Sequence, residues 1–249
     1  MTEQQIDSMS EQKVVLVTGA NKGIGYAIAA GLGALGWKVG VGARDDQRRA
    51  AAVAGLAAGG ADVFGVPLDV TDDASVAAAA ALLEERTGRV DVLVNNAAIT
   101  GGAPQLPTTV DPAVMRVVVE TNVIGVIRVT NALLPLVRRS PSPRIMNMSS
   151  SVGSLTLQST PGAETGPIAV AYSPSKRFLN AVTVQYAKEL HETNILVNAA
   201  CPGFVATDLN HFRGTRTPEQ GAAIAITLAT LPDDGPTGGF YDDAGVIAW

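Results

Sequence analysis

The sequence predicts a doubly wound α/β fold, in which helices cover both faces of a parallel sheet. Short apolar runs rich in β-branched residues alternate along the chain with segments of helical periodicity. These runs are apolar on both faces, as is typical of the strands of a parallel sheet that is covered on both sides. Alanine and glycine are abundant while aromatic residues make up 4% of the chain, which favours close packing of helices on a sheet over a sandwich or barrel of bulky strands.

The expected elements follow one another regularly along the chain. Strands are expected at 14–17, 39–41, 63–66, 90–94, 144–150 and 195–201, with a short last strand near Phe240. Helices are expected at 24–35, after Asp45, and at 76–83, 114–136, 174–190 and 219–231. Segments 153–168 and 207–217 have no clear periodicity. Ligands of such sheets bind at the carboxyl ends of the strands, so the chemically active residues should directly follow strands.

Length and composition bound the class of protein. The 249 residues suit one domain at 12–249, preceded by a loose tail at 1–11. A net charge of -5 without a basic block argues against nucleic acid and favours a small-molecule partner. One cysteine and two histidines give no metal-ligand spacing, so no metal is expected. The polar start and the absence of an apolar run approaching membrane-spanning length predict a cytoplasmic protein without membrane contact.

A glycine-rich loop, TGANKGIG, joins the first expected strand to the first expected helix. Glycine permits a tight turn and a close approach to a pyrophosphate, while the helix start offers N–H donors and the positive end of the helix dipole. The spacing of Gly19, Gly23 and Gly25 matches neither the Walker pattern nor G-x-G-x-x-G. A ligand-free turn is the alternative, but the place of the loop after the first strand favours a dinucleotide site.

Four motifs in this order resemble the classical type of the short-chain dehydrogenase/reductase family. They are TGANKGIG at 18–25, NNAA at 95–98, YSPSK at 172–176 and CPGFVATD at 201–208. The resemblance covers the chain from about residue 13 to its end. It implies a Rossmann-like fold, a nicotinamide dinucleotide and hydride transfer. Ala98 departs from the family's usual glycine, which adds one methyl group near the nicotinamide ribose without changing the assignment.

The residues after the second expected strand bear on the choice between NAD and NADP(H). NAD-specific sites place an acidic residue there to bind the ribose 2′-hydroxyl, and this position is Ala43. Arg44 follows, and its planar guanidinium suits a 2′-phosphate. Lys22 in the glycine loop would add a second positive charge on the same side. Surface cations with Asp45 as the acid for NAD are the alternative, but the pattern favours NADP(H).

Further cofactor contacts are implied by the resemblance. Asp69 matches the residue that binds the adenine amino group, with a helix N-cap shared with Thr71 as the alternative. Thr207 matches the residue that bonds the nicotinamide carboxamide, in a turn shaped by Pro202 and Gly203. The other motif positions expected to contact the cofactor are Asn21, Ile24, Val70, Asn96, Ala97, Val205, Tyr172 and Lys176.

Tyr172 and Lys176 are four residues apart, so on a helix they lie on one face, one turn apart. Pro174 between them is tolerated only in a first helical turn, which places the pair at a helix start. A nearby ammonium lowers the pKa of a phenol, as general acid–base catalysis requires. An ordinary amphipathic pair is the alternative for the spacing alone. The resemblance implies that Tyr172 is the acid and Lys176 its tuner and ribose anchor.

Three consecutive serines follow an expected strand in MNMSSSVGS. In relatives the catalytic serine is usually the second of a Ser-Ser pair, three residues before a glycine, so Gly153 selects Ser150 over its neighbours. Ser150 would donate a hydrogen bond to the substrate carbonyl oxygen, where negative charge develops. Asn122 in ETNVIG matches the family asparagine that holds a water between the lysine and bulk solvent. An ordinary surface residue is the alternative for Asn122.

The combined motifs predict an NADPH-dependent oxidoreductase that moves hydride between the nicotinamide and a ketone, an aldehyde or a secondary alcohol. The glycine loop and the ending GPTGGFYDDAGVIAW resemble the carbonyl reductase branch. The alternatives are a non-catalytic NADPH-binding sensor and an extended-type sugar epimerase or dehydratase. The family habit implies a homodimer or homotetramer. An insertion between Ser150 and Tyr172 is expected to reshape the substrate mouth.

Overall fold

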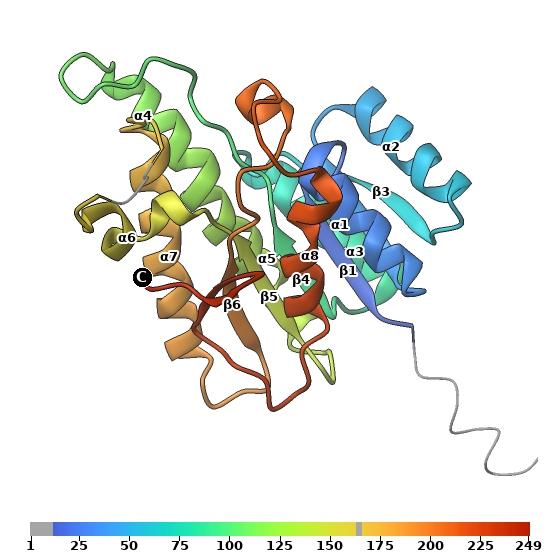
Figure 1. Ribbon diagram of the computed structural model, residues 1–249. Coiled ribbons are helices and arrows are strands. Elements are labelled where there is room, and N and C mark those ends of the chain that lie inside the picture. The colour runs from blue at the N-terminus through green and yellow to red at the C-terminus, as the bar shows by residue number, and fades with distance from the viewer. Residues whose placement is uncertain (1–11, 163–165) are drawn as a thin grey trace, which may run out of the picture.

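One eight-stranded sheet organises the computed structural model, which describes residues 12–162 and 166–249 (Figure 1). The strands are β1 (Val14–Thr18), β2 (Lys38–Ala43), β3 (Val63–Pro67), β4 (Val92–Asn95), β5 (Arg144–Met148), β6 (Leu196–Ala200), β7 (Phe240–Asp242) and β8 (Gly245–Val246). Their order is β3-β2-β1-β4-β5-β6-β7-β8, parallel throughout except for the antiparallel β8. The predicted doubly wound fold is confirmed, and the expected tail at 1–11 lies outside the described residues.

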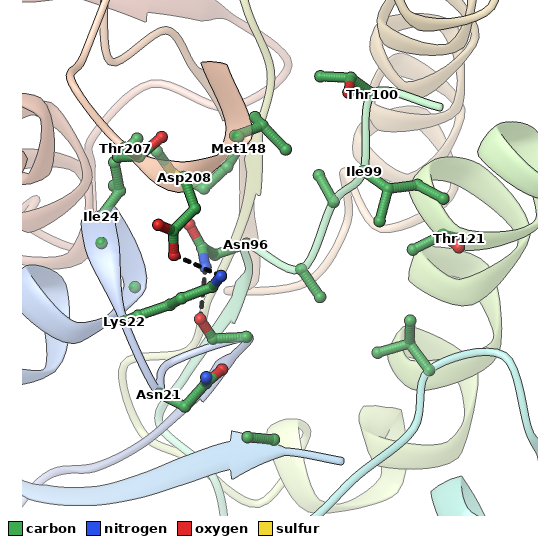
Figure 2. Close-up of a pocket in the computed structure, with 18 of the residues that line it drawn as sticks. Asn21, Lys22, Ile24, Asn96, Ile99, Thr100, Thr121, Met148, Thr207 and Asp208 are labelled. Carbon is green, nitrogen blue, oxygen red and sulfur yellow. Dashed lines mark hydrogen bonds and ion pairs between the residues drawn. The ribbon is translucent and has the colours of Figure 1, made fainter. Parts of the chain in front are cut away.

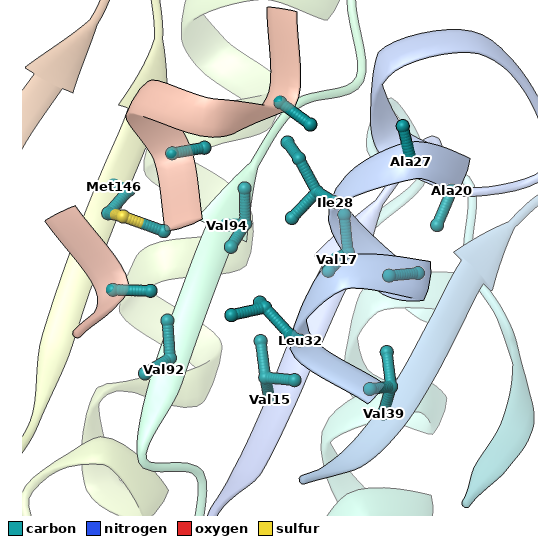
Figure 3. Packing of buried hydrophobic residues seen from close by; sticks show 14 of the residues in the cluster. Val15, Val17, Ala20, Ala27, Ile28, Leu32, Val39, Val92, Val94 and Met146 are labelled. Carbon is teal, nitrogen blue, oxygen red and sulfur yellow. The ribbon is translucent and has the colours of Figure 1, made fainter. Parts of the chain in front are cut away.

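Helices cover both faces of this sheet. They are α1 (Gly23–Ala34), α2 (Asp46–Ala58), α3 (Asp73–Thr87), α4 (Pro112–Val119), α5 (Gly125–Val137), α6 (Leu155–Ser159), α7 (Tyr172–Glu189) and α8 (Pro218–Ala229). Helices α1, α2 and α8 share one buried cluster with alternate residues of the central strands, and Figure 3 shows Ile28 and Leu32 of α1 against Val15, Val17 and Val94. Helices α3, α5 and α7 pack on the opposite face.

The order of the strands reverses between β1 and β4, because β1 pairs with β2 on one side and with β4 on the other. The connections that leave β1 and β4 therefore diverge to opposite sides of the sheet, and the crevice between them is where ligands of open α/β sheets bind. The glycine loop follows β1 at this point, so the topology places it at the mouth of the crevice.

The long helix expected at 114–136 is divided in the structure. A π-helical segment, η2 (Glu120–Ile124), separates α4 from α5. Together the stretch Pro112–Val137 is long and apolar enough, by length and composition, to cross a membrane, so the expectation that no run approaches that length is wrong. Part of its apolar surface is buried in the protein core, since Val129, Leu133 and Leu136 of α5 belong to the cluster on one face of the sheet.

The insertion before Tyr172 contains two short helical turns that the sequence did not predict, η3 (Ser151–Gly153) and α6. Ser154 Oγ donates to the carbonyl oxygen of Ala248 at 2.6 Å, and Thr156 donates to that of Trp249 through its backbone N at 3.1 Å and its Oγ1 at 2.7 Å. The described part of the insertion is therefore anchored on the last residues of the sequence. The described part of the insertion does not line the cleft at the carboxyl end of the sheet, and its effect on the substrate mouth stays a prediction.

A chain of buried polar side chains fixes helix α7 over the central strands. Asn95 Nδ2 on β4 donates to Asn147 Oδ1 on β5 at 2.9 Å, and to Thr130 Oγ1 on α5 at 3.1 Å. Asn147 Nδ2 in turn donates to Thr183 Oγ1 on α7 at 2.9 Å. Because leaving buried polar groups unpaired costs free energy, this chain adds to the apolar packing that holds α7 over the sheet.

Candidate active site

A cleft of about 790 Å³ opens at the carboxyl ends of β1, β2, β4 and β5. Its walls come from loops that directly follow these strands, as expected for this sheet topology. Figure 2 shows Asn21, Ile24, Asn96 and Thr207 around it. The predicted cofactor residues that line the cleft are Gly19, Asn21, Lys22, Gly23, Ile24, Gly25, Arg44, Asp69, Val70, Asn96, Ala97, Tyr172, Lys176, Pro202 and Thr207. Gly203, Val205, Asn122 and Ser150 do not line it.

The glycine loop adopts a backbone that requires glycine. Gly19 and Gly23 have φ values of +65° and +56°, in the left-handed region where other residues are strained. A Cβ atom on Gly25 would lie 2.5 Å from both Asn96 Nδ2 and the carbonyl oxygen of Gly19. Helix α1 begins at Gly23, and no side chain caps its first turn. The loop therefore presents uncapped helical N–H groups to the cleft, which suits an anionic pyrophosphate.

The NNAA motif braces this loop from the neighbouring strand. Asn96 Nδ2 donates to the carbonyl oxygens of Thr18 at 2.9 Å and Gly19 at 3.3 Å. Thr18 Oγ1 in return accepts from the backbone N–H groups of Asn96 and Ala97, at 2.9 and 3.0 Å. The second asparagine of the motif thus holds the shape of the glycine loop.

The far end of the cleft presents the residues that bear on cofactor choice. Arg44 and Asp45 both line the cleft directly after β2, and Oδ1 of Asp45 also caps α2 by accepting from Arg48 N at 2.9 Å. The alternative of Asp45 as the acid for NAD therefore stays open in the structure, and the choice of NADP(H) rests on Arg44 and on the relatives described below. Burial opposes ionisation of Asp69, but hydrogen bonds from Thr71 and the nearby charge of Arg44 hold its pKa below the usual value. An anionic Asp69 suits a hydrogen-bond donor such as an amino group.

Asp69 does not cap a helix, so the alternative interpretation of this residue is wrong. The N-cap of α3 is Asp72, whose carboxylate accepts from Ser75 N at 2.6 Å. Asp69 Oδ1 instead accepts from Thr71 through its backbone N at 2.9 Å and its Oγ1 at 2.7 Å. These bonds fix the Asp69 carboxylate at the edge of the cleft.

Lys22 forms an ion pair across the cleft mouth. Its Nζ lies 2.5 Å from Asp208 Oδ2, and both side chains are about half exposed, at 53% and 49% (Figure 2). The sequence did not single out Asp208, which directly follows Thr207. Exposed ion pairs contribute about 0–1 kcal/mol, so the ammonium can exchange this carboxylate for a more highly charged phosphate at little cost. Its contact with a ribose phosphate stays a prediction.

Tyr172 and Lys176 line the inner end of the cleft, and Ser150 lies beside them, next to Tyr172. Tyr172 is the first residue of α7, and Pro174 lies in the first turn, as the sequence predicted. The Tyr172 side chain is hydrogen-bonded to that of Ser150, which follows β5 and precedes η3. Lys176 Nζ lies 5.6 Å from the centroid of the Tyr172 ring and donates to the carbonyl oxygen of Met148 at 2.7 Å. Two hydroxyl groups and one ammonium are thereby gathered in one place.

Burial dominates the ionisation of this pair. It raises the pKa of Tyr172 to about 12, an effect that the nearby Cys201 thiol increases and the Ser150 hydrogen bond opposes. Burial likewise lowers the pKa of Lys176 to about 8. The sequence-based expectation of a lowered Tyr172 pKa is therefore wrong for this structure, because desolvation outweighs the lowering effect of the Ser150 hydrogen bond. Near neutral pH the phenol is protonated, which is the form that a proton donor needs.

Asn122 lies fully buried in the π-helical segment η2. Its Oδ1 accepts from Ile99 N at 2.9 Å, and its Nδ2 donates to Ile99 O at 2.9 Å and to Ser175 Oγ at 3.0 Å. Ser175 Oγ donates in turn to the carbonyl oxygen of Tyr172 at 2.6 Å. Asn122 thus joins the loop after β4 to the start of α7. The alternative of a surface residue is wrong, while the role in a water relay stays a prediction.

Gln105 is a structural contact of Tyr172 that the sequence did not indicate. Its side chain is buried, and its Oε1 accepts from the backbone N–H groups of Ala171 at 3.1 Å and Tyr172 at 3.3 Å. Its Nε2 donates to the carbonyl oxygens of Thr100 and Gly102, at 2.5 and 2.7 Å. Gln105 therefore caps α7 from a distant loop. A single glutamine in a loop carries no sequence signal for such a contact.

The donor sets available near the cleft suit an organic cofactor. Within residues 12–162 and 166–249, no three His, Cys, Asp or Glu side chains are grouped so as to hold a metal ion. The cleft instead combines uncapped helical N–H groups, a guanidinium, an anionic carboxylate and the Ser150–Tyr172–Lys176 group. This arrangement suits an elongated anionic ligand whose inner end reacts beside two hydroxyl groups.

Replacing Lys176 by methionine is expected to remove a pH-dependent part of the stability. Because the Lys176 pKa falls from 10.5 to about 8 on folding, the folded protein binds fewer protons than the unfolded chain between these values. The free energy of unfolding therefore rises with pH in this window, by on the order of 3 kcal/mol for this group. Urea unfolding of both proteins at about pH 7.5, 9 and 10 measures the difference. Parallel pH profiles would contradict the lowered pKa.

Comparison with known proteins places this geometry in a family. A model of the short chain dehydrogenase family matches residues 13–217. Short-chain dehydrogenase/reductase 1 of Saponaria officinalis is 34% identical, with 94% of this chain and 95% of that protein covered. Carbonyl reductase 1 of Bos taurus, whose name specifies NADPH, is 34% identical, with 96% and 99% covered.

A solved structure shows the same fold with a ligand named in its description. The NADPH-bound carbonyl reductase from chicken fatty liver has a TM-score of 0.83 and 30% identity, with 96% of this chain and 99% of that chain covered. These matches confirm the predicted family, the Rossmann-like fold and the oxidoreductase class. The chain belongs to the short-chain dehydrogenase/reductase family.

Proposed function

We propose that this protein is an NADPH-dependent carbonyl reductase that transfers hydride to a ketone or an aldehyde, and that also oxidises the corresponding secondary alcohol. The observation that carries the proposal is that Tyr172 and Lys176 line the same cleft as the glycine loop, with Ser150 hydrogen-bonded to Tyr172. The bovine relative and the chicken structure, both named as carbonyl reductases with NADPH, support this function.

The cleft fits NADPH along its length. The glycine loop offers uncapped N–H groups to the pyrophosphate, Asp69 an acceptor to the adenine amino group, and Arg44 a guanidinium to the 2′-phosphate. Lys176 and Thr207 line the inner part, where the ribose and the carboxamide of the nicotinamide would lie. The cofactor supplies the hydride when it is bound.

The side chains at the inner end of the cleft would bind and protonate the carbonyl oxygen of the substrate. The Ser150 and Tyr172 hydroxyl groups are hydrogen-bonded to each other, so one carbonyl oxygen can accept from both. As hydride adds to the carbonyl carbon, the C=O π electrons move onto this oxygen, and the two donors stabilise its negative charge. The oxygen then takes the Tyr172 proton, and the nearby Lys176 ammonium stabilises the phenolate that remains.

Tyr172→Phe is expected to abolish carbonyl reduction while NADPH binding is retained. The variant keeps the ring but lacks the proton donor, and loss of such a group typically costs about 10²- to 10⁴-fold in rate. NADPH oxidation over a panel of ketones and aldehydes measures turnover, and quenching or enhancement of NADPH fluorescence measures binding.

Tyr186→Phe is the matched control, because it removes another partly buried phenol from the same helix, one that donates to Asn131 Oδ1 at 2.7 Å. It should leave turnover nearly unchanged. Equal inactivity of wild type and Tyr172→Phe on every compound, with NADPH still bound, would favour the non-catalytic sensor instead.

Arg44→Ala is expected to weaken binding of NADPH about 10- to 100-fold and binding of NADH by less than about threefold. The guanidinium would contact only the 2′-phosphate, which NADH lacks. Fluorescence titration with each cofactor gives the dissociation constants. Arg213→Ala, which removes an exposed guanidinium outside the cleft lining, is the control. A wild-type preference for NADH, or an equal loss for both cofactors, would overturn the choice of NADPH.

The proposal also covers the domain organisation, the location and the oligomeric state of the enzyme. We regard residues 12–249 as one folding unit, because the strands share one sheet. A cytoplasmic location agrees with a single cysteine, Cys201, which is free and buried. A homodimer or homotetramer is supported by a hollow between α5 and α7, lined by Ile127, Val182 and Tyr186 among others, with the half-exposed Phe178 on the same helix.

Phe178→Glu is expected to shift the assembly toward monomers. A carboxylate on the α7 surface would be desolvated if a second copy packed there, which costs several kcal/mol. Sedimentation velocity at micromolar concentration compares the variant with wild type. A wild-type protein that sediments as a monomer would refute the oligomer, and an unchanged assembly in the variant would exclude this face as the interface.

A further inference from the structure

Asn180 shares a helix face with the two reactive residues of α7. It lies one turn beyond Lys176 and two turns beyond Tyr172, and residues four apart on a helix point to the same side. Its side chain is buried, with 4% of the residue exposed. No function described above uses this amide, and its place suggests that it acts on the same site.

The Asn180 amide holds both sides of the turn that carries Ser150. Its Oδ1 accepts from Ser149 Oγ at 2.5 Å, and its Nδ2 donates to the carbonyl oxygen of Gly153 at 3.2 Å. Ser149 directly precedes Ser150, and Gly153 closes the turn by donating its N–H to Ser150 O at 2.8 Å. One side chain of α7 is therefore bonded to the residues on either side of the reactive serine.

The turn rests directly on the helix at this point. A Cβ atom on Gly153 would lie 3.1 Å from Asn180 Nδ2 and 3.1 Å from the Lys176 Cβ atom. This separation is tighter than ordinary packing, so a larger residue would push the turn away from α7. The distance between the Ser150 and Tyr172 hydroxyl groups thus depends on how closely the turn is held to the helix.

We propose that Asn180 is a positioning residue for Ser150. It fixes the Ser149–Gly153 turn on the helix that carries Tyr172 and Lys176. The hydroxyl groups of Ser150 and Tyr172 can then donate hydrogen bonds to the same carbonyl oxygen. The inference rests on the proposed carbonyl reduction. The alternative is that Asn180 only stabilises the fold, as any buried hydrogen-bonded amide does.

Thr183 provides the control that separates these two roles. It lies on α7 less than one turn beyond Asn180, is fully buried, and accepts a hydrogen bond from Asn147 Nδ2 at 2.9 Å. Thr183→Val keeps the shape but leaves this donor unpaired. Its bonds do not reach the Ser150 turn, so it should lower stability without loosening the serine.

The experiment is a double-mutant cycle between Asn180→Ala and Ser150→Ala. We expect Asn180→Ala to lower kcat about 10- to 100-fold, with NADPH affinity unchanged within about twofold. In the Ser150→Ala background the same change should cost less than about threefold, because the group it positions is gone. Thr183→Val should keep kcat within about twofold at a temperature where every variant is folded.

A loss of kcat in Thr183→Val that equals the loss in Asn180→Ala would overturn the proposal. The proposal would also be overturned if Asn180→Ala lowered kcat by the same factor in the Ser150→Ala background as in wild type. Should Asn180→Ala fail to fold, Ser149→Ala removes one of the two bonds with less disturbance and should lower kcat in the same direction and with the same dependence on Ser150.

Amide hydrogen exchange adds a readout that does not need turnover. Exchange at residues 149–154 should be faster in Asn180→Ala than in wild type and unchanged in Thr183→Val. If wild type reduces no carbonyl, the proposed function fails, and exchange alone then reports on the anchor. Unchanged exchange in Asn180→Ala would show that the amide does not hold the turn.

Discussion

The position of helix α7 over strands β4 and β5 is the constraint on which the site depends. Apolar packing of α7 in the core sets this position together with the chain of bonds from Asn95 through Asn147 to Thr183. Leaving a buried partner unpaired costs about 1–3 kcal/mol, but the apolar packing keeps α7 in place when a single bond of the chain is lost. Because Tyr172 and Lys176 lie on the same helix, their places relative to the strand ends follow from this core packing as a whole.

The same burial that fixes the helix determines the chemistry of its residues. Desolvation favours the neutral phenol of Tyr172 and disfavours the ammonium of Lys176, which donates a hydrogen bond to the carbonyl oxygen of Met148. A buried ammonium with so little compensation costs stability. It also attracts any negative charge that forms nearby more strongly than it would in water. The buried Lys176 ammonium therefore lowers the stability of the fold, but it lies where it can stabilise a negative charge on the Tyr172 oxygen.

The sequence predicts the fold, and most of the predicted cofactor residues lie around one cleft, but contacts between segments far apart in the sequence were missed. Some features depend only on neighbouring residues, so the sequence predicts them directly. These are the alternation of strands and helices, the glycine loop, and the helix start marked by Pro174 in the first turn of α7. Gln105 and Asn180 act through contacts with segments far away in the sequence, and each has an ordinary local context.

The raised pKa of Tyr172 was mispredicted for a related reason, because spacing shows which charges are near but not how much water is excluded. The division of the long helix by η2 was also missed, since a π-helical segment keeps the apolar pattern of its neighbours. Both properties, the exclusion of water around Tyr172 and the backbone hydrogen bonding of η2, are set by tertiary packing.

The two walls of the cleft are held with different strength. The wall after β4 is joined to α7 by buried bonds, through Asn122 to Ser175 and through Gln105 to the backbone of Tyr172. The wall after β6 is joined to the glycine loop by the half-exposed pair of Lys22 and Asp208.

In the wall after β6, His211 and Phe212 also have φ values of +56° and +58°, which are strained for residues other than glycine. Moving the wall after β6 breaks the half-exposed ion pair of Lys22 and Asp208, whereas moving the wall after β4 breaks buried hydrogen bonds. The buried bonds of Asn122 and Gln105 therefore keep the β4 side in place relative to the reactive phenol.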